Sequence, residues 1–164
     1  MQVRMMPRFA VAAAAAATMF VAAAGANAAT VVNVQLTDKG LTTEMATGLA
    51  YATPGANMSH ATASVKLSRT SVPAGDVSFN VVNMSEEMIH EMLVVPVRPG
   101  AELPYAPDEN AVDEEKVDSK GEVSELDPGK TGTLTVNLKP GTYLLFCNVP
   151  GHFDAGMWAM FTVT

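Results

Sequence analysis

The sequence predicts an all-β fold, a Greek-key β-sandwich with one short helix. Three observations support this prediction. Several short segments are apolar or alternate apolar and polar residues, turns containing Gly or Pro separate them, and one long acidic segment interrupts the series as a crossover between sheets would. Because no internal repeat and no linker divides the chain, we expect a single domain after an N-terminal targeting segment.

The predicted strands follow one another from residue 31 to residue 164. Segment 76–82 places Val77, Phe79 and Val81 on one face, because side chains alternate across a strand. Segment 92–97 is an almost continuous run of apolar residues. The complete set of predicted strands is 31–36, 62–70, 76–82, 92–97, 133–138, 143–147 and 157–164.

Residues 99–129 break this pattern. They hold ten acidic residues against two lysines. Pro107 and Asp108, followed by the stretch ENAVDEEKV, predict one short helix within this crossover, because Pro and acidic side chains favour the first helical turn. The acidic residues have two interpretations, a solvated loop, which we favour, and a docking surface for a basic partner.

The N-terminus predicts export. Two arginines precede an Ala-rich apolar run that ends in Ala-Asn-Ala at positions 26–28, which fits the cleavage rule of small residues. We therefore predict that residues 1–28 are a signal peptide cleaved near Ala28, and that residues 29–164 form one domain in the periplasm. A membrane anchor is the alternative, and it is disfavoured because the run is mostly alanine. No later segment is long and apolar enough to span a membrane.

The charge balance restricts the class of partner. The chain has 10 Lys and Arg against 17 Asp and Glu, a net charge of −7. Cleavage after residue 28 removes Arg4 and Arg8, so the balance becomes 8 against 17, a net charge of −9 over 136 residues. Nucleic-acid binding is disfavoured because no basic patch is present to neutralise phosphates. A basic protein is the natural electrostatic complement.

The stretch YLLFCNVPGHFDAGM contains the strongest chemical signal. It places three residues, Cys147 (the single cysteine), His152 and Met157, on one turn-rich segment between two predicted strands. A thiolate, an imidazole and a thioether suit a soft or borderline metal, copper above all. Two histidines, one cysteine and a weak axial methionine form a blue-copper electron-transfer site. The fourth ligand must then be His60 or His90, the two remaining histidines.

Strand periodicity predicts how these ligands are oriented. Tyr143, Leu145 and Cys147 share one face of a strand, and Met157 begins the core-facing phase of the next strand. The side chains of Cys147 and Met157 should therefore point to the interior at one end of the sheet. His152 lies at the tip of the loop, where we expect its ring to bind the metal, reach the surface and serve as the electron port.

Two segments together resemble a known family. The segment GTYLLFCNVPGHFDAGMWAMFTV resembles the C-terminal ligand loop of the cupredoxins, the plastocyanin–azurin superfamily of single-copper proteins, and residues 72–97 resemble the cupredoxin stretch that leads to the first histidine ligand. The resemblance implies a cupredoxin-like sandwich. It also implies that one type 1 copper ion is held by His90, Cys147, His152 and Met157.

The same resemblance implies a function. Small periplasmic cupredoxins transfer single electrons between redox partners and are not enzymes, so we expect a basic partner such as a c-type cytochrome or an oxidase. A periplasmic copper-binding protein for copper trafficking or resistance is the alternative, favoured by the pair His90-Glu91 and the nearby methionines. A copper enzyme is disfavoured because three histidines cannot supply both this site and a second catalytic copper.

Three further features carry expectations. His60 lies in a stretch of small residues and should be an exposed loop histidine. Glu91 follows His90 where cupredoxins often carry Asn or Ser, and we expect it to accept N–H bonds from the Cys147 loop or to place negative charge near the copper. Methionines around His90 are expected to form a soft apolar rim, and they are Met84, Met88 and Met92.

Overall fold

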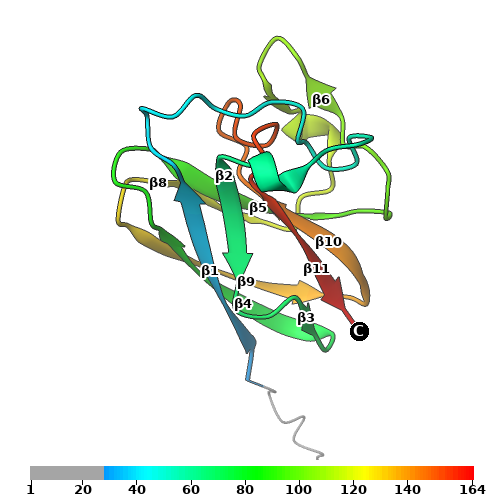
Figure 1. The fold of residues 1–164 in the computed structure, drawn as a ribbon. Helices are drawn as coiled ribbons and strands as arrows, with labels where there is room; N and C mark the ends of the chain where they lie inside the picture. The colour runs from blue at the N-terminus through cyan, green and yellow to red at the C-terminus, as the bar shows by residue number, and fades with distance from the viewer. Residues whose placement is uncertain (1–27) are drawn as a thin grey trace, which may run out of the picture.

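The computed structural model describes residues 28–164, whose strands form two packed β-sheets and a third, short sheet of two strands (Figure 1). One sheet has the strand order β2-β1-β4-β9, and its strands are β1 (Thr30–Asp38), β2 (Ala63–Leu67), β4 (Gly75–Asn83) and β9 (Thr131–Leu138). The other has the order β3-β11-β10-β5-β8, with β3 (Ser71–Val72), β5 (His90–Pro96), β8 (Glu122–Leu126), β10 (Gly141–Phe146) and β11 (Trp158–Val163). The predicted Greek-key β-sandwich is confirmed. The predicted signal peptide lies outside the described residues, apart from its last residue.

Alternate residues of the strands fill the space between the sheets, as the period of two predicts. Val77, Phe79 and Val81 of β4 are all buried there. Phe79 packs edge-to-face against Phe161 of β11, with 5.4 Å between ring centroids. Burial of each such side chain stabilises the fold by about 1.5–3 kcal/mol, so this core holds the two sheets in one relative position.

A second apolar layer covers the outer face of β5 and β10. Met92 and Val94 face the core between the sheets, whereas Leu93 and Val95 belong to a second buried cluster. This cluster is completed by Trp158 of β11 and by side chains from the segments that cross over the sheet, including Tyr51, Leu103, Tyr105, Val112 and Phe153. Because both faces of β5 are buried after its first two residues, the sequence from Met92 to Pro96 is continuously apolar rather than alternating.

The acidic crossover contains more strand than the sequence predicted. β6 (Tyr105–Ala106) pairs with β7 (Ala111–Val112), and β8 also falls within the acidic segment. The predicted helix is reduced to a single 3-10 turn, η2 (Glu114–Lys116). The reason is tertiary: the backbone of Val112 is bound by the side chain of Asn148, and such contacts outweigh a weak local preference for helix.

Helical structure within residues 28–164 is limited to η2 and a second 3-10 turn, η1 (Met58–His60). In that part of the chain, no helix is long and apolar enough to cross a membrane. The segment between β1 and β2, the acidic crossover and the loop between β10 and β11 all lie at one end of the sandwich (Figure 1). This end carries the candidate site.

Candidate metal centre

Three of the predicted ligands meet at this end of the sandwich. The Nδ1 atoms of His90 and His152 and the Sγ atom of Cys147 lie within 4.8 Å of one another. The two Nδ1 atoms are 3.1 Å apart, and Sγ is 3.3 Å from His152 Nδ1 and 3.9 Å from His90 Nδ1. All three residues are at most 2% exposed. Ligands at about 2.0–2.3 Å from one ion lie roughly 3.5 Å from each other, so the spacing suits a metal.

A tight turn brings His152 back toward Cys147. The C=O of Val149 accepts a hydrogen bond of 2.9 Å from the N–H of His152, which closes a β-turn around Pro150 and Gly151. Gly151 has a φ of 85°, as the third position of a type II turn requires, and proline sets φ at the second position. The turn residues noted in the sequence therefore have a defined role in placing the imidazole.

Met157 lies at the end of the same loop and is buried in the core. Its side chain is fully buried in the apolar cluster that contains Cys147. Its N–H donates to the C=O of His152 at 3.0 Å, and its C=O accepts from the N–H of Cys147 at 3.1 Å. These bonds hold Met157 beside the other loop ligands. Its role as the axial ligand stays a prediction.

His90 reaches the site from the other direction, as the first residue of β5. The preceding loop is anchored by Asn83, whose Nδ2 donates to the C=O groups of Met88 and Leu126 at 2.8 Å each. Asn83 Oδ1 accepts from the N–H of Ser85 at 2.9 Å. Sequence reasoning missed Asn83, although it continues the inward-facing phase of β4, where an amide signals a buried anchor.

Asn148 is a second anchor that the sequence did not reveal. Its Oδ1 accepts from the N–H of Val112 at 2.7 Å, and its Nδ2 donates to the C=O of Val112 at 2.9 Å. The same amide donates to Glu114 Oε1 at 2.7 Å. The acidic crossover is thereby bound to the residue that follows Cys147.

The donor groups are neutral and suited to copper. Burial raises the pKa of the Cys147 thiol to about 12, and burial together with His90 lowers the pKa of His152 to about 4. The N–H of Glu91 points at Sγ from 3.4 Å and helps to stabilise a thiolate there. A cation would displace the thiol proton, and one thiolate with two imidazoles is a donor set that copper prefers.

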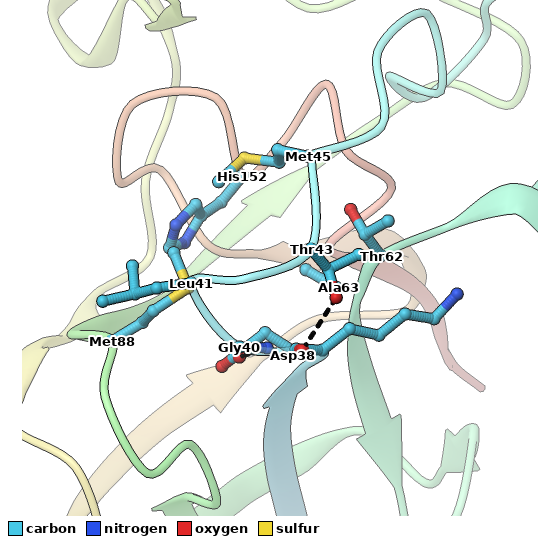
Figure 2. A pocket seen from close by; sticks show the side chains of 10 residues that line it. Asp38, Gly40, Leu41, Thr43, Met45, Thr62, Ala63, Met88 and His152 are labelled. Atoms are coloured by element: carbon cyan, nitrogen blue, oxygen red, sulfur yellow. Dashed lines mark hydrogen bonds between the residues drawn. The ribbon is translucent and has the colours of Figure 1, made fainter.

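His152 is less accessible than the sequence predicted. We expected its ring to reach the surface, but it is buried and lines a hollow of about 90 Å³. Leu41, Met45 and Met88 line the same hollow (Figure 2). The expectation was wrong because the segment after β1 lies against the ligand loop, an arrangement that local sequence does not encode. Apolar side chains therefore lie between the imidazole ring of His152 and the surface.

The other expectations divide as follows. His60 is an exposed residue of η1 and is not part of the ligand cluster, as predicted. Met88 lines the hollow, in agreement with an apolar rim, whereas Met84 is exposed and does not line that hollow, and Met92 is a core residue. The difference follows from strand phase, since Met92 faces the space between the sheets.

Glu91 lies half-buried beside the cysteine loop. Burial, which is the largest effect, and repulsion from Glu114 and Glu122 raise the pKa of Glu91 to about 7. A hydrogen bond with the backbone of Asn148 acts in the opposite direction. A carboxylate can only accept from a backbone N–H. This contact with the residue after Cys147 matches the first of the two expectations for Glu91.

Comparison with known proteins assigns the family. The family model of the sulfocyanin (SoxE) domain matches residues 57–164, well over half of the chain. The chain belongs to the sulfocyanin family. Sulfocyanins are cupredoxins, so the resemblance seen in the sequence is confirmed. Cupredoxins are type 1 copper electron carriers, in agreement with the predicted cofactor and function. In this sulfocyanin-family protein, β1 and the segment after it precede the matched residues.

Solved structures support the same fold. Reduced auracyanin from the photosynthetic bacterium Roseiflexus castenholzii is similar with a TM-score of 0.53 and 20% identity, covering 84% of the sulfocyanin-family chain and 99% of auracyanin. Rusticyanin from Thiobacillus ferrooxidans is similar with a TM-score of 0.51 and 19% identity, covering 84% of this chain and 79% of rusticyanin. No curated protein sequence matches the chain.

Proposed function

We propose that this protein is a periplasmic one-electron carrier whose single type 1 copper is held by His90, Cys147, His152 and Met157. The observation that carries the proposal is the convergence of three buried donor atoms, two imidazole nitrogens and one sulfur, within 4.8 Å. A bound copper ion supplies the one-electron couple between Cu(II) and Cu(I).

The protein contributes a site whose donor atoms are already in place. His90 belongs to a strand that is paired on both sides, by β8 and β10. His152 is held by the turn at Pro150, and the backbone N–H of Cys147 donates a hydrogen bond to the C=O of Met157. Ligands fixed by such supports keep one arrangement in both oxidation states, so little rearrangement accompanies electron transfer.

The visible absorption spectrum of the protein loaded with one equivalent of Cu(II) tests this proposal. We expect an intense band from charge transfer between the Cys147 thiolate and Cu(II). Reduction should remove the band and reoxidation should restore it. A weak band typical of nitrogen and oxygen ligands alone would contradict the proposal.

We also propose export with cleavage near Ala28, which leaves residues 29–164 as one domain. The N-terminal cleavage pattern supports this, as does β1, which begins at Thr30, just after the proposed cleavage site. Mass spectrometry of protein from a periplasmic extract should give the mass of a chain that starts at Ala29. A product that retains the N-terminal segment would favour the anchor instead.

A copper-trafficking protein is the competing interpretation, and we propose that this protein is neither a cargo carrier nor an enzyme. The burial of His90, Cys147 and His152 supports tight retention of the metal. Three histidines in the whole chain also leave no set for a separate catalytic copper. Rapid electron exchange combined with slow loss of copper to a Cu(I) chelator would support the carrier. Ready transfer of copper would favour trafficking.

The proposed partner is a basic redox protein, such as a c-type cytochrome or an oxidase. An open groove of about 510 Å³ lies beside Pro150 of the ligand loop. Its acidic lining residues are Glu109, Asp113, Glu114 and Glu115. Negative charge at this position would steer a basic protein toward the site.

Glu115→Gln is expected to slow reduction by a basic c-type cytochrome about two-fold at low ionic strength, because it removes one exposed charge from the groove. The difference should vanish well above ~0.1 M salt, where the Debye length falls below about 10 Å. Stopped-flow kinetics over a salt series measures this. Asp76→Asn on β4 is the control, since it removes one exposed charge outside the groove. Equal rates for the two variants would show that the acidic residues form a solvated loop with no role in docking the partner.

Glu91→Gln is expected to raise the reduction potential above pH 7 and to leave it nearly unchanged below pH 6. The pKa of Glu91 is raised to about 7, so its carboxyl is neutral below that pH and negative above it. The negative form favours Cu(II), so the wild-type potential should fall as the pH rises through this range, whereas the variant should lack this step. Voltammetry from pH 5 to 9 measures both proteins, and parallel curves would assign Glu91 no influence on the copper.

A further inference from the structure

Asp38 and His90 form a buried pair across the end of the sandwich. Asp38 is the last residue of β1, and His90 is the first residue of β5 in the other sheet. Asp38 Oδ2 lies 2.7 Å from His90 Nε2, and the two side chains are 6% and 0% exposed. Asp38 also precedes the residues that the sulfocyanin family model matches.

Both carboxylate oxygens of Asp38 have a defined partner. The N–H of Gly40 donates to Oδ1 at 2.6 Å, and the ring of His90 lies at Oδ2, where Nε2 is 2.7 Å away. One side of the carboxylate is therefore held by the backbone, and the other faces a proposed copper ligand.

The positions of the two ring nitrogens select one tautomer of His90. Nε2 lies 2.7 Å from Asp38 Oδ2, so an N–H on Nε2 donates to the carboxylate. A histidine that binds a metal through Nδ1 needs a lone pair on that atom. Nδ1 faces Cys147 Sγ at 3.9 Å and His152 Nδ1 at 3.1 Å. The hydrogen bond to Asp38 thus presents a free lone pair to the other two ligands.

Asp38 is held by regular structure. Strand β1 pairs with β4 on one side and with β2 on the other, where Asp38 is opposite Ala63. The inward-facing phase of β1 runs through Val34 and Leu36 and ends in Asp38. A side chain supported by a central strand holds its partner more accurately than one on a loop.

We propose that Asp38 is a positioning residue of the copper site, which orients His90 through Nε2 and whose negative charge favours Cu(II) over Cu(I). The inference rests on the proposed copper site. A carboxylate that fixes a metal-binding histidine sets the orientation of the ring and raises its basicity as a ligand. A carboxylate with a purely structural role would stabilise the fold without altering the balance between the two oxidation states.

Asp38→Asn tests this because it keeps the shape and removes the charge. We expect its affinity for Cu(II) to fall about 10- to 100-fold, with a smaller loss for Cu(I). Each tenfold difference between the two losses raises the potential by about 59 mV. Asp38→Glu, which restores the charge, should recover part of the change, and Asp76→Asn is the matched control because its carboxylate is exposed. Equal potentials for Asp38→Asn and Asp76→Asn would overturn the proposal.

A second measurement needs no copper. Proton–nitrogen NMR of the metal-free wild-type protein should show a slowly exchanging His90 Nε2–H, which shifts in Asp38→Asn but not in Asp76→Asn. A proton on His90 Nδ1 in the wild type would overturn the proposal even if the variant failed to fold. An absent blue band in copper-loaded wild type would instead refute the proposed function. An intact blue band with unaltered potential in Asp38→Asn would refute this inference alone.

Discussion

Replacing Cys147 by serine should abolish the intense visible band of the copper-loaded protein while the sandwich remains folded. The sulfur lies 3.9 Å from His90 Nδ1 and 3.3 Å from His152 Nδ1, a spacing that would let one metal ion bind all three atoms, and no other cysteine is present in the chain to replace it. A hydroxyl is a hard, weak ligand that cannot supply thiolate charge transfer. Because removing a residue that only supports a metal ligand already lowers metal affinity 10- to 100-fold, we expect the loss of a ligand itself to lower Cu(II) affinity by more than about 100-fold.

Folding of this variant is measured without metal. The serine hydroxyl can accept the N–H of Glu91 in place of the sulfur, so the free energy of unfolding should fall by no more than about 2 kcal/mol. His60→Ala is the control, because His60 is exposed and outside the cluster, and its spectrum should equal that of the wild type. A Cys147→Ser protein that keeps the band, or a bleached His60→Ala protein, would show that the ligands are assigned wrongly.

Replacing Met157 by leucine should keep the fold and the blue colour and raise the reduction potential. The side chain is fully buried beside Cys147, and an exchange of Met for Leu nearly conserves volume, so it usually costs less than about 1.5 kcal/mol. Loss of a weak thioether donor destabilises Cu(II) more than Cu(I). A tenfold difference in the two affinities corresponds to a rise of about 59 mV.

Met92→Leu provides the matched control for this prediction. Met92 is also fully buried in the same core cluster, but it belongs to β5 and is not a proposed ligand. Voltammetry should therefore show a higher potential for Met157→Leu and an unchanged potential for Met92→Leu. Equal potentials in both variants, or a decrease for Met157→Leu, would remove Met157 from the ligand set.

Local pattern was sufficient to predict most of the sandwich. The alternation of Val77, Phe79 and Val81 marks β4, and turns with Gly or Pro separate it from its neighbours. The loop ligands Cys147 and His152 were also predictable, since they are five positions apart in the chain and the residues between them include one Pro-Gly turn. Such features depend on side-chain periodicity and turn chemistry, which act over a few residues.

The errors arose where distant segments meet. A helix was expected after Pro107, but Asn148 binds the backbone of Val112, and this segment extends as β7. His152 was expected at the surface, but it lines a hollow that it shares with Leu41 and Met45. Neither contact leaves a periodic signal, because the partners are far apart in the chain.

The sequence by itself determined the all-β class, the cupredoxin-like ligand loop and the acidic character of the protein, because these follow from local spacing and composition. Only the tertiary structure decided that Asp38 contacts His90 and that His152 is covered. Asp38 and His90 are 52 residues apart and belong to different sheets. The strand predicted from the sequence ended at residue 36, two residues before Asp38, and the contact of Asp38 with His90 depends on how the two sheets pack.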